Sequence, residues 1–411
     1  MDLINILGKS LNDEQLSLLS KVAAISLAQG VDIYLVGGAV RDILLDHEVQ
    51  DLDLVIEGNA EIFAYLVATK LSGSVKSHSQ FATATLNVNV TSLDFISARS
   101  EQYPNPGHLP VITFGSIEAD LARRDFSINA LAINVSNLYD CEIIDLHNGL
   151  QDLQDGIIRI LHPKSFSDDA TRILRALRYE QRLGFKLEDA TQISLLSDLQ
   201  MLNTISGQRL MKEIHKWFKE DYPYKIIQRA HNLGVFPNIH KSLNGLQYAL
   251  KAIEIEGSGI SLDERIWLGL MLQGLSPVES RAVAERLRLS GNELKLLAEV
   301  SDLYSAGDSL SNTGLSSHDI YSILSGKSQH AITVYLLMTK NSTVKEHLSK
   351  FLHELRHIKP YLTGKDLIEM GIPKGPSIGN MLESLLYAKL DGIVKSRNDE
   401  LELVSQKQML T

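Results

Sequence analysis

The sequence VQDLDLVIEG, residues 49 to 58, decides the fold, because two aspartates interrupt a short apolar run that ends in a turn. Apolar residues followed by glycine are typical of a β-strand that runs into a turn. Side chains alternate between the two faces of a strand, so Asp51 and Asp53 point the same way. Two such carboxylates repel each other unless a cation such as Mg²⁺ lies between them. The pattern predicts metal ligands or, alternatively, the polar face of a half-exposed edge strand.

The segment just before this strand is LVGGAVRD, residues 35 to 42. Gly37 and Gly38 end an apolar run, and Arg41 and Asp42 follow on a short helix. Backbone N–H groups at a glycine turn, together with a guanidinium, suit an anionic phosphate. A tight strand-to-helix turn that needs small residues is the alternative. A phosphate cradle beside paired carboxylates is typical of nucleotidyl transfer, in which metal ions clamp the attacking hydroxyl, the α-phosphate and the leaving pyrophosphate.

Two further groups of polar residues follow along the chain. Asp94 closes the strand-like TSLDF, where it is either a further carboxylate of the metal site or an acid at a strand end. In DLARRDFSINALAI, Arg123 and Arg124 precede Asp125 and Asn129. An arginine fork suits triphosphate oxygens, and an aspartate or asparagine suits a ribose hydroxyl. A solvated charged turn before a buried helix is the alternative.

The fourth motif is FSDDATRILRALRYEQRLGF, residues 166 to 185. Ser167 or Asp168 can cap a helix, which places Asp169 and Arg172 three residues apart on one face. The two form either an intrahelical ion pair or a base-reading pair, because a carboxylate accepts from the amine of cytosine or adenine while a guanidinium donates to ring acceptors. Three more arginines either face nucleic-acid backbone or form a solvated basic stripe: Arg175, Arg178 and Arg182.

Composition limits the class of protein. The 411 residues suggest two to four domains, and a hydrophobic content of 44% with 22% charged residues is typical of a folded globular chain. The start of the chain has no signal-peptide pattern, no apolar run is long enough to cross a bilayer, and one cysteine allows no intrachain disulfide, so we expect a cytoplasmic protein. A net charge of -10 argues against indiscriminate nucleic-acid binding but allows binding through a local basic surface.

Strand and helix signals alternate up to about Asp145, and helical patterns dominate from about Leu150. The four motifs, in this order and spacing, resemble those of the class II tRNA nucleotidyltransferases (the CCA-adding enzymes) and the related bacterial poly(A) polymerases, along essentially the whole chain. One departure is DDATR, where the family often has EDxxR, so that Asp168 replaces a glutamate.

The resemblance implies a role for each motif. In that family the first motif holds the triphosphate, the second holds catalytic metal, the third contacts ribose and phosphates, and the fourth selects CTP and ATP. The implied catalytic residues are Asp51, Asp53 and Asp94, with Mg²⁺ held by Asp51 and Asp53. The implied nucleotide-binding residues are Gly37, Gly38, Arg41, Asp42, Arg123, Arg124, Asp125, Asn129, Asp169 and Arg172.

The segment DFISARSEQYPNPGHLPVITF, residues 94 to 114, resembles the flexible loop of the family, including Arg99. Its prolines and glycine favour a mobile excursion rather than a strand. In the family this loop helps the switch from C addition to A addition, and enzymes that add only CC lack it. The resemblance therefore argues against a CC-only enzyme.

The implied fold is α+β, a mixed-sheet nucleotidyltransferase head followed by an all-helical neck, body and tail. The implied reaction is template-independent addition of C, C and A to the 3′ end of tRNA from CTP and ATP. The implied partner is the acceptor arm of tRNA, and no membrane is expected to take part. An A-adding enzyme, a poly(A) polymerase and a nonenzymatic RNA-binding relative remain alternatives. The expected divisions are a leading helix (1–30), the catalytic head (31–150), the neck with the nucleotide-selecting motif (151–220), the body (221–355) and a tRNA-binding tail (356–411).

Overall fold

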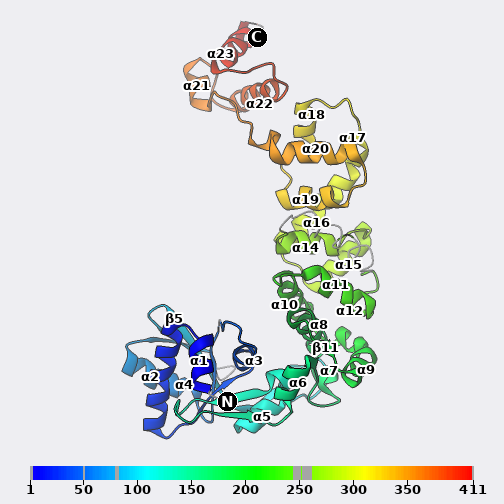
Figure 1. Cartoon of the computed structure of the whole chain (residues 1–411). Helices are drawn as coiled ribbons and strands as arrows, with labels where there is room; N and C mark the ends of the chain where they lie inside the picture. Colours follow the sequence, from blue (N-terminus) through cyan, green and yellow to red (C-terminus); the bar gives the residue numbers. More distant parts are fainter. Residues whose placement is uncertain (1–2, 50, 79–82, 244–250, 252–261, 410–411) are drawn as a thin grey trace. The chain divides into compact units, whose positions relative to one another are not determined.

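The computed structural model of the chain describes residues 3–49, 51–78, 83–243, 251 and 262–409 (Figure 1). Contacts between residues divide the chain into two compact units, Met1–Lys241 and Ser242–Thr411. The division groups residues 221–241, which the sequence analysis assigned to the body, with the N-terminal unit. Each unit is described below by itself.

A seven-stranded mixed sheet forms the centre of the N-terminal unit, in the order β3-β4-β5-β2-β1-β8-β9. Strand β2 lies in the middle, antiparallel to β1 and parallel to β5. The edge-strand alternative for the two aspartates is therefore wrong. The strands are β1 (Ile33–Val36), β2 (Asp53–Ile56), β3 (Ser74–His78), β4 (Thr83–Val88), β5 (Thr91–Ser97), β8 (Leu131–Asn134) and β9 (Glu142–Asp145).

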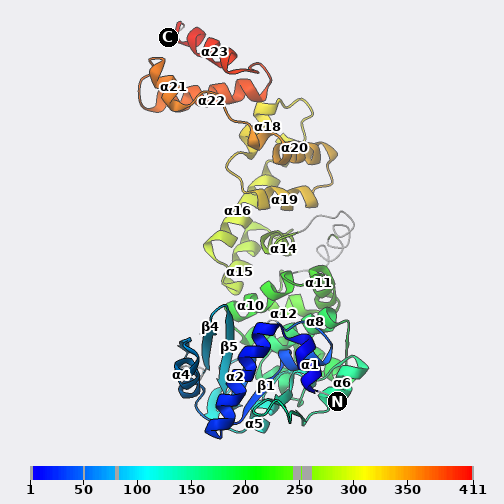
Figure 2. The ribbon, with the colours of Figure 1, turned by 60° about the vertical axis from the view of Figure 1, so that its left-hand side comes forward.

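Helices cover the sheet on both faces. The expected leading helix is confirmed as α2 (Asp13–Gln29). It begins with a capping box between Asn12 and Gln15, and it ends at Gly30, which has a left-handed conformation. Helices α2 and α4 (Ala60–Leu71) contact β5, while α5 (Ile117–Ala122) contributes Ile117 and Leu121 to the core on the β1 side (Figure 2). The other helices here are α1 (Leu3–Ser10), α3 (Gly38–Leu44), the 3-10 turn η2 (Ser127–Asn129) and α6 (Gly149–Asp155).

The segment predicted to be a mobile excursion is a β-hairpin at both of its ends. Strands β6 (Arg99–Gln102) and β7 (Val111–Phe114) pair antiparallel as a separate sheet. The prediction of no strand is wrong because the prolines, which cannot donate to a ladder, are confined to the connection 103–110 and leave the flanks free to pair. The hairpin places Arg99 on a defined strand.

Helices form the rest of the N-terminal unit. Helix α8 is its centre, and the Trp217 indole on α10 donates to the Leu174 carbonyl on α8 at 3.0 Å. The expected all-helical neck contains one small exception, a parallel pair of two-residue strands, β10 (Ile157–Ile158) and β11 (Lys186–Leu187). The helices are α7 (Ser165–Asp168), α8 (Thr171–Leu183), α9 (Asp189–Ser197), η3 (Leu199–Thr204), α10 (Gly207–Phe218), α11 (Pro223–Asn232) and α12 (Val235–Ile239).

The described part of the C-terminal unit is helical, which confirms the α+β fold class. Its last three helices share a small core that includes Leu367, Leu385 and Val404. In the described ranges of the chain, no helix is both long and apolar enough to cross a membrane. The helices are α14 (Glu264–Met271), α15 (Pro277–Leu287), α16 (Gly291–Ser305), α17 (Gly307–Leu310), α18 (Ser317–Leu324), α19 (Gln329–Met338), α20 (Ser342–His353), η4 (Leu355–His357), α21 (Gly364–Glu369), α22 (Pro376–Leu390) and α23 (Arg397–Met409).

Candidate active site

Three aspartates gather at the start of the central strand. Asp53 begins β2 and lies directly opposite Asp94 of β5 in the parallel register. Thr85 of β4 donates to Asp94 Oδ1 at 2.5 Å, and Asp51 is exposed just before β2. Burial and then the Asp94 charge raise the pKa of Asp53, against the opposing effect of Arg124, and Asp51 raises it further. The carboxylates are therefore close enough to repel one another.

This donor set fits Mg²⁺ better than a metal that needs a full protein cage. Among the residues that the structure describes, no group of three or more histidine, cysteine, aspartate or glutamate side chains is arranged so that it could hold a metal ion. Magnesium commonly takes one or two carboxylates and keeps water and substrate phosphates as its other ligands. The repulsion on Asp53 is also what a cation would relieve.

Two features of the turn after β1 require a glycine at position 37. Its φ of 67° lies in the left-handed region, and a Cβ there would lie 2.5 Å from Nη1 of Arg124. Gly38 then begins α3. Arg124 directs Nε and Nη2 to Asp120 Oδ2 at 3.2 and 2.8 Å, so its Nη1 is the atom that approaches the turn. The glycine pair and the second arginine of the RRD motif therefore meet at one place, where Arg124 also acts on Asp53.

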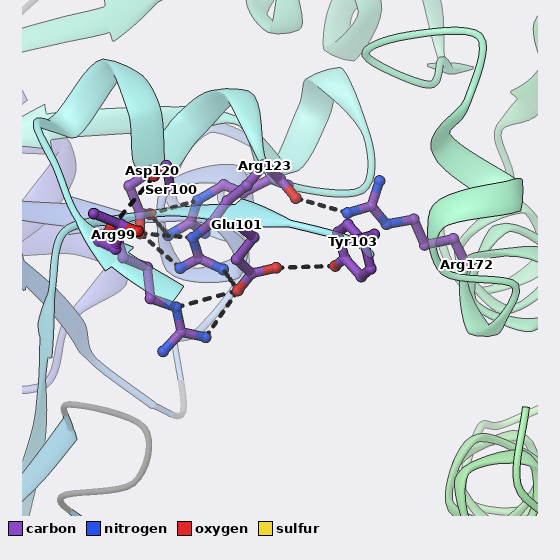
Figure 3. A network of polar contacts seen from close by, with 9 residues as sticks. Arg99, Ser100, Glu101, Tyr103, Asp120, Arg123 and Arg172 are labelled. Carbon is purple, nitrogen blue, oxygen red and sulfur yellow. Dashed lines mark hydrogen bonds and ion pairs between the residues drawn. The ribbon is translucent and has the colours of Figure 1, made fainter. Parts of the chain in front are cut away.

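The Arg123 guanidinium donates to two carboxylates, one on α5 and one on the hairpin (Figure 3). Its Nε and Nη2 donate to Oδ1 of Asp120, at 2.9 and 2.6 Å, and its Nη1 donates to Oε1 of Glu101 at 3.0 Å. Glu101 also accepts from Arg99 and from the Tyr103 hydroxyl, the latter at 2.9 Å. The Asp120 side chain is fully buried. The guanidinium of Arg123 therefore links α5 to the hairpin.

Arg41 is buried as well, with 2% of its surface exposed. Its Nε and Nη2 bind the Asp42 carboxylate, and its Nη1 donates to Asn129 Oδ1 at 2.7 Å. Asn129 in turn donates to Asp125 Oδ1 at 2.9 Å. The alternative of a solvated charged turn is wrong for Asp125 and Asn129, because both are buried. Hydrogen bonds join the glycine-turn motif directly to the RRD motif.

The same network continues into α8. Burial is the largest single effect and raises the pKa of Asp125, but the charge and hydrogen bond of Arg175, the hydrogen bond from Asn129 and the charge of Arg172 together lower it to about 2. Arg175 Nε donates to Asp125 Oδ2 at 2.7 Å. The guanidinium carbons of Arg41, Arg175 and Arg178 lie 5.1, 5.4 and 4.6 Å from the ring centre of Tyr179, within the range of cation–π attraction.

The predicted basic stripe on α8 is mostly internal. Arg175 is paired as described, and Arg178, only 6% exposed, pairs with Glu220 at 3.0 Å. Arg182 alone of the three is largely exposed, 4.0 Å from the Asp42 carboxylate. The solvated-stripe interpretation is therefore wrong for Arg178, while Arg175 is paired with a carboxylate of the same unit and the backbone-facing interpretation stays a prediction.

Asp169 lies before α8 and not within it. Its Oδ1 accepts from the Thr171 backbone N–H at 3.0 Å, from the Thr171 hydroxyl at 2.7 Å and from Arg209 Nη2 at 2.7 Å. The structure contains no ion pair between Asp169 and Arg172, both of which lie in its described part, so the intrahelical-pair alternative is wrong. The reason is that the helix starts at Thr171, after Asp169.

Arg172 is fixed independently of Asp169. Its Nη1 donates to the hydroxyl of the buried Ser165 at 2.7 Å, and its Nη2 donates to the backbone carbonyl of Arg123 at 2.7 Å (Figure 3). Arg172 therefore receives its position from α7 and from the RRD segment. The two expected base-reading residues lie near each other in the chain but are held by separate partners.

Sequence reasoning missed the residues that hold these side chains. Asp120 lies three and four residues before the two arginines that it binds, a spacing that signals intrahelical pairing and so offered a clue. Ser165 also lies near its partner, but a serine hydroxyl gives no sequence signal. Arg209 lies 40 residues from Asp169, and only the packing of α10 beside α8 brings the two together.

Comparison with known proteins agrees with this arrangement. Residues 33–159 match the poly A polymerase head domain, and residues 184–246 match a domain described as a probable RNA and SrmB-binding site of polymerase A. An A-adding tRNA nucleotidyltransferase of Halalkalibacterium halodurans is 31% identical over 98% of this chain and 95% of its own length. The chain belongs to the class II tRNA nucleotidyltransferase and poly(A) polymerase family.

Two further proteins of this family are similar to the chain, one in sequence and one in structure. An A-adding tRNA nucleotidyltransferase of Geobacter sulfurreducens is 30% identical over 98% of this chain, which spans 48% of that relative's length. Among solved structures, the Thermotoga maritima CCA-adding enzyme complexed with tRNA is similar with a TM-score of 0.78 and 28% identity, over 99% of both chains. The family resemblance seen in the sequence is confirmed.

Proposed function

We propose that this protein adds C, C and A to the 3′ end of tRNA, from CTP and ATP and without a nucleic-acid template. The proposal rests on the hydrogen bonds of Asp169 and Arg172, the two side chains expected to read the base. Asp169 Oδ2 and Arg172 Nε make no hydrogen bond within the described residues, although every other polar atom of the Asp169 carboxylate and the Arg172 guanidinium has a partner. Each residue is held firmly and keeps one atom for a ligand.

The free atoms match the pattern shared by cytosine and adenine. Both bases present an exocyclic amine beside a ring nitrogen that accepts, so the amine donates to Asp169 Oδ2 and the ring nitrogen accepts from Arg172. Uracil and guanine present a carbonyl and a ring N–H instead. That reversal sets oxygen against oxygen and leaves buried polar groups unpaired, at a cost of about 1–3 kcal/mol for each group.

The rest of the site supplies nucleotidyl-transfer chemistry. Asp51 and Asp53 would hold Mg²⁺, which would neutralise charge on the α-phosphate, and Asp94, opposite Asp53, would assist the tRNA hydroxyl. Arg124 Nη1, beside Gly37 and Gly38, binds triphosphate oxygens. Asp125 and Asn129, to which the resemblance assigns the ribose, are hydrogen-bonded to Arg175, to Arg41 and to each other, so in this proposal they position the neighbouring groups.

Arg41 and Arg123 act differently from Arg124 in this proposal. Their guanidinium groups are already engaged, by Asp42 and Asn129 in one case and by Asp120 and Glu101 in the other. They position the turn and the RRD segment, and Asp42 holds Arg41 in place. Both arginines of the RRD motif were expected to contact the triphosphate. In this proposal only Arg124 does so.

A second candidate is addition of the terminal A alone, on tRNA that already ends in CC. It is favoured by the names of the two relatives at 30% and 31% identity, both A-adding tRNA nucleotidyltransferases. The presence of the 99–114 hairpin, which resembles the loop that CC-only enzymes lack, is compatible with either candidate.

One assay separates the candidates. The purified protein is given tRNA ending at the discriminator base, at C or at CC, with Mg²⁺ and with CTP and ATP singly and together. Full CCA addition predicts that all three tRNAs are completed. Extension of the CC-ended tRNA alone assigns A addition, a long A tail assigns poly(A) polymerase activity, and no extension of any tRNA assigns a nonenzymatic role.

The base-reading and metal roles are tested by two substitutions. Arg172→Ala should raise incorporation of UTP and GTP relative to CTP and ATP, whereas Lys212→Ala, an exposed residue on α10, should not. Asp53→Asn should lose several kcal/mol of transition-state stabilisation, about a thousandfold in rate, with the fold retained. An Arg172→Ala enzyme with the wild-type nucleotide profile would disprove base reading by this residue.

A further inference from the structure

The two N-terminal helices contact the chain just before the aspartates of β2. Val49 lies two residues before Asp51, and both of its backbone polar groups bond to these helices. Its N–H donates to the carbonyl of Ser10, the last residue of α1, at 3.3 Å. Its carbonyl accepts from Nε2 of Gln15, on α2, at 3.0 Å. The segment that leads to Asp51 is therefore anchored to helices that precede the matched head domain, residues 33–159.

The position of Asp51 depends on this anchor more than the position of Asp53 does. Asp53 lies within the sheet, where β1 and β5 flank β2. Asp51 is exposed before the strand, and within the described residues no hydrogen bond or ion pair holds its side chain. On one side of it Leu52 is buried and accepts from the Asp94 N–H at 3.0 Å, and on the other side Val49 is buried and bonded to the helices. The backbone on either side therefore fixes where the Asp51 carboxylate lies.

The amide of Gln15 is suited to this contact. Gln15 is the third residue of α2 and is 7% exposed, and its Oε1 accepts from the Asn12 N–H at 3.0 Å as one half of the capping box. Either glutamate or glutamine can complete such a box. Only glutamine also carries an NH₂ group, and that group donates to the Val49 carbonyl. The bond to Val49 is therefore the contact that requires glutamine at position 15.

We propose that Gln15 is a positioning residue for the metal site, because by holding the Val49 carbonyl it places the Asp51 carboxylate where Mg²⁺ would bind. The inference rests on the metal role of Asp51 in the proposed function. Partners that orient the ligands of a metal typically change its affinity by about 10–100-fold. Without the Gln15 donor, Asp51 is free to move away from Asp53, and affinity for the metal should fall.

The test measures binding of Mn²⁺, used as the probe, from the paramagnetic resonance signal of the free ion. The full chain is titrated with a CTP analogue that cannot be cleaved at the α-phosphate. Gln15→Met removes the donor without adding charge, and Gln15→Glu removes the donor but keeps the capping box. Both should bind Mn²⁺ about tenfold more weakly than the wild type. An added carboxylate would by itself attract the cation, so weaker binding in Gln15→Glu cannot come from its charge.

Two variants at the ends of α2 are the controls. Asn12→Ala removes the other half of the capping box and keeps the Gln15 amide, so its thermal midpoint should fall while its Mn²⁺ affinity stays as in the wild type. Gln29→Glu makes the same chemical change at the exposed end of α2 and should alter neither quantity. In tRNA extension both Gln15 variants should need about tenfold more Mg²⁺ for half-maximal rate, and saturating Mg²⁺ should restore kcat.

A double variant shows whether Gln15 acts through Asp51. Asp51→Asn alone should weaken Mn²⁺ binding. Adding Gln15→Met to Asp51→Asn should cause no further loss, because two changes that act on one interaction are not additive. A full additional loss in the double variant would place the effect of Gln15 elsewhere and overturn the inference.

Other results would also overturn it. Wild-type Mn²⁺ affinity in both Gln15 variants, together with a lower thermal midpoint, would show that Gln15 only stabilises the fold. Weaker binding in one of the two variants alone would contradict the loss of a shared donor. Wild-type Mn²⁺ affinity in Asp51→Asn would remove the metal role of Asp51 and the inference with it. A chain that binds Mn²⁺ as expected but extends no tRNA would remove the proposed function and leave the role of Gln15 intact.

Discussion

The arginines of the N-terminal unit differ from Arg281 and Arg288, which lie on α15 and at its end in the C-terminal unit, in what surrounds them. Arg41, Arg123 and Arg175 are held by carboxylates or an amide of their own unit at 2.6–3.0 Å. Arg281 and Arg288 have no such partner in the described part of the chain. A guanidinium that is already neutralised fixes the geometry of its neighbours, whereas an unpaired one can neutralise a ligand. The difference separates positioning residues from binding residues.

The same comparison explains the aspartates of β2 and β5. Neither Asp53 nor Asp94 forms an ion pair within the described residues, and the pKa of Asp53 is raised by burial and by Asp94. A pair of carboxylates without a basic partner suits a divalent cation. The following predictions test whether pairing is the property that separates the two groups.

The largest expected effect is at the centre of the paired network. Asp120→Asn leaves two arginines facing a neutral amide, and breaking a buried pair costs about 3–5 kcal/mol. The free energy of unfolding, measured in urea, should fall by that amount. Glu118→Gln, an exposed change on the same helix, should stay within about 0.5 kcal/mol of the wild type. A loss below about 1 kcal/mol in Asp120→Asn would show that the pairing does not stabilise the unit.

Removal of the Ser165 hydroxyl should affect selection more than folding. Ser165→Ala releases one hydrogen bond to the Arg172 guanidinium, a class of bond that contributes about 1.5–3 kcal/mol. Discrimination of CTP against UTP in single-nucleotide addition should therefore fall about tenfold or more. Ser167→Ala, on the same short helix, is the control because within the described residues its hydroxyl donates to the Lys164 carbonyl and not to Arg172. Unchanged discrimination in Ser165→Ala would mean that the Arg123 carbonyl alone positions Arg172.

The Asp125–Arg175 pair predicts a specific acid sensitivity. The pKa of Asp125 is lowered from 3.8 to about 2, so the pair stabilises the fold fully above pH 4 and loses this contribution as pH falls through about 2. One pKa unit corresponds to about 1.4 kcal/mol, so a lowering from 3.8 to about 2 corresponds to roughly 2–3 kcal/mol. Urea unfolding at pH 5 and pH 2.5 should show a smaller loss in Asp125→Asn than in the wild type. Equal acid losses in both proteins would contradict the pairing.

The smallest effect is expected at exposed basic residues of the C-terminal unit. Arg281→Ala and Lys345→Ala remove side chains that have no ion pair or side-chain hydrogen bond within the described residues, so the free energy of unfolding should change by less than about 0.5 kcal/mol. Thermal and urea unfolding of both variants check this. A loss above 1 kcal/mol would mean that these side chains stabilise the fold, and the comparison with the N-terminal unit would then fail.

Much of the fold could be predicted from local patterns. The leading helix was predicted from its Asn-Asp-Glu start and from Gly30, and strands β1, β2, β4 and β5 were predicted from short apolar or alternating runs. The 99–114 hairpin was not predicted, because the prolines in its connection indicated a loop, and its two strands pair with each other and not with the main sheet. The start of α8 was placed too early, because a capping signal at Asp168 does not show which residue begins the helix.

The sequence by itself determined the family, the order of the motifs and the residue types available for chemistry, because these depend on spacing within single elements. The tertiary structure alone decided which charged groups are free. Arg41 meets Asn129 across 88 residues, Arg172 meets the Arg123 carbonyl across 49, and Arg209 meets Asp169 across 40. Periodicity fixes the face of a helix or strand on which a residue lies, but the neighbour on that face is set by how the elements pack. The distinction between paired and unpaired arginines therefore appears only in the folded chain.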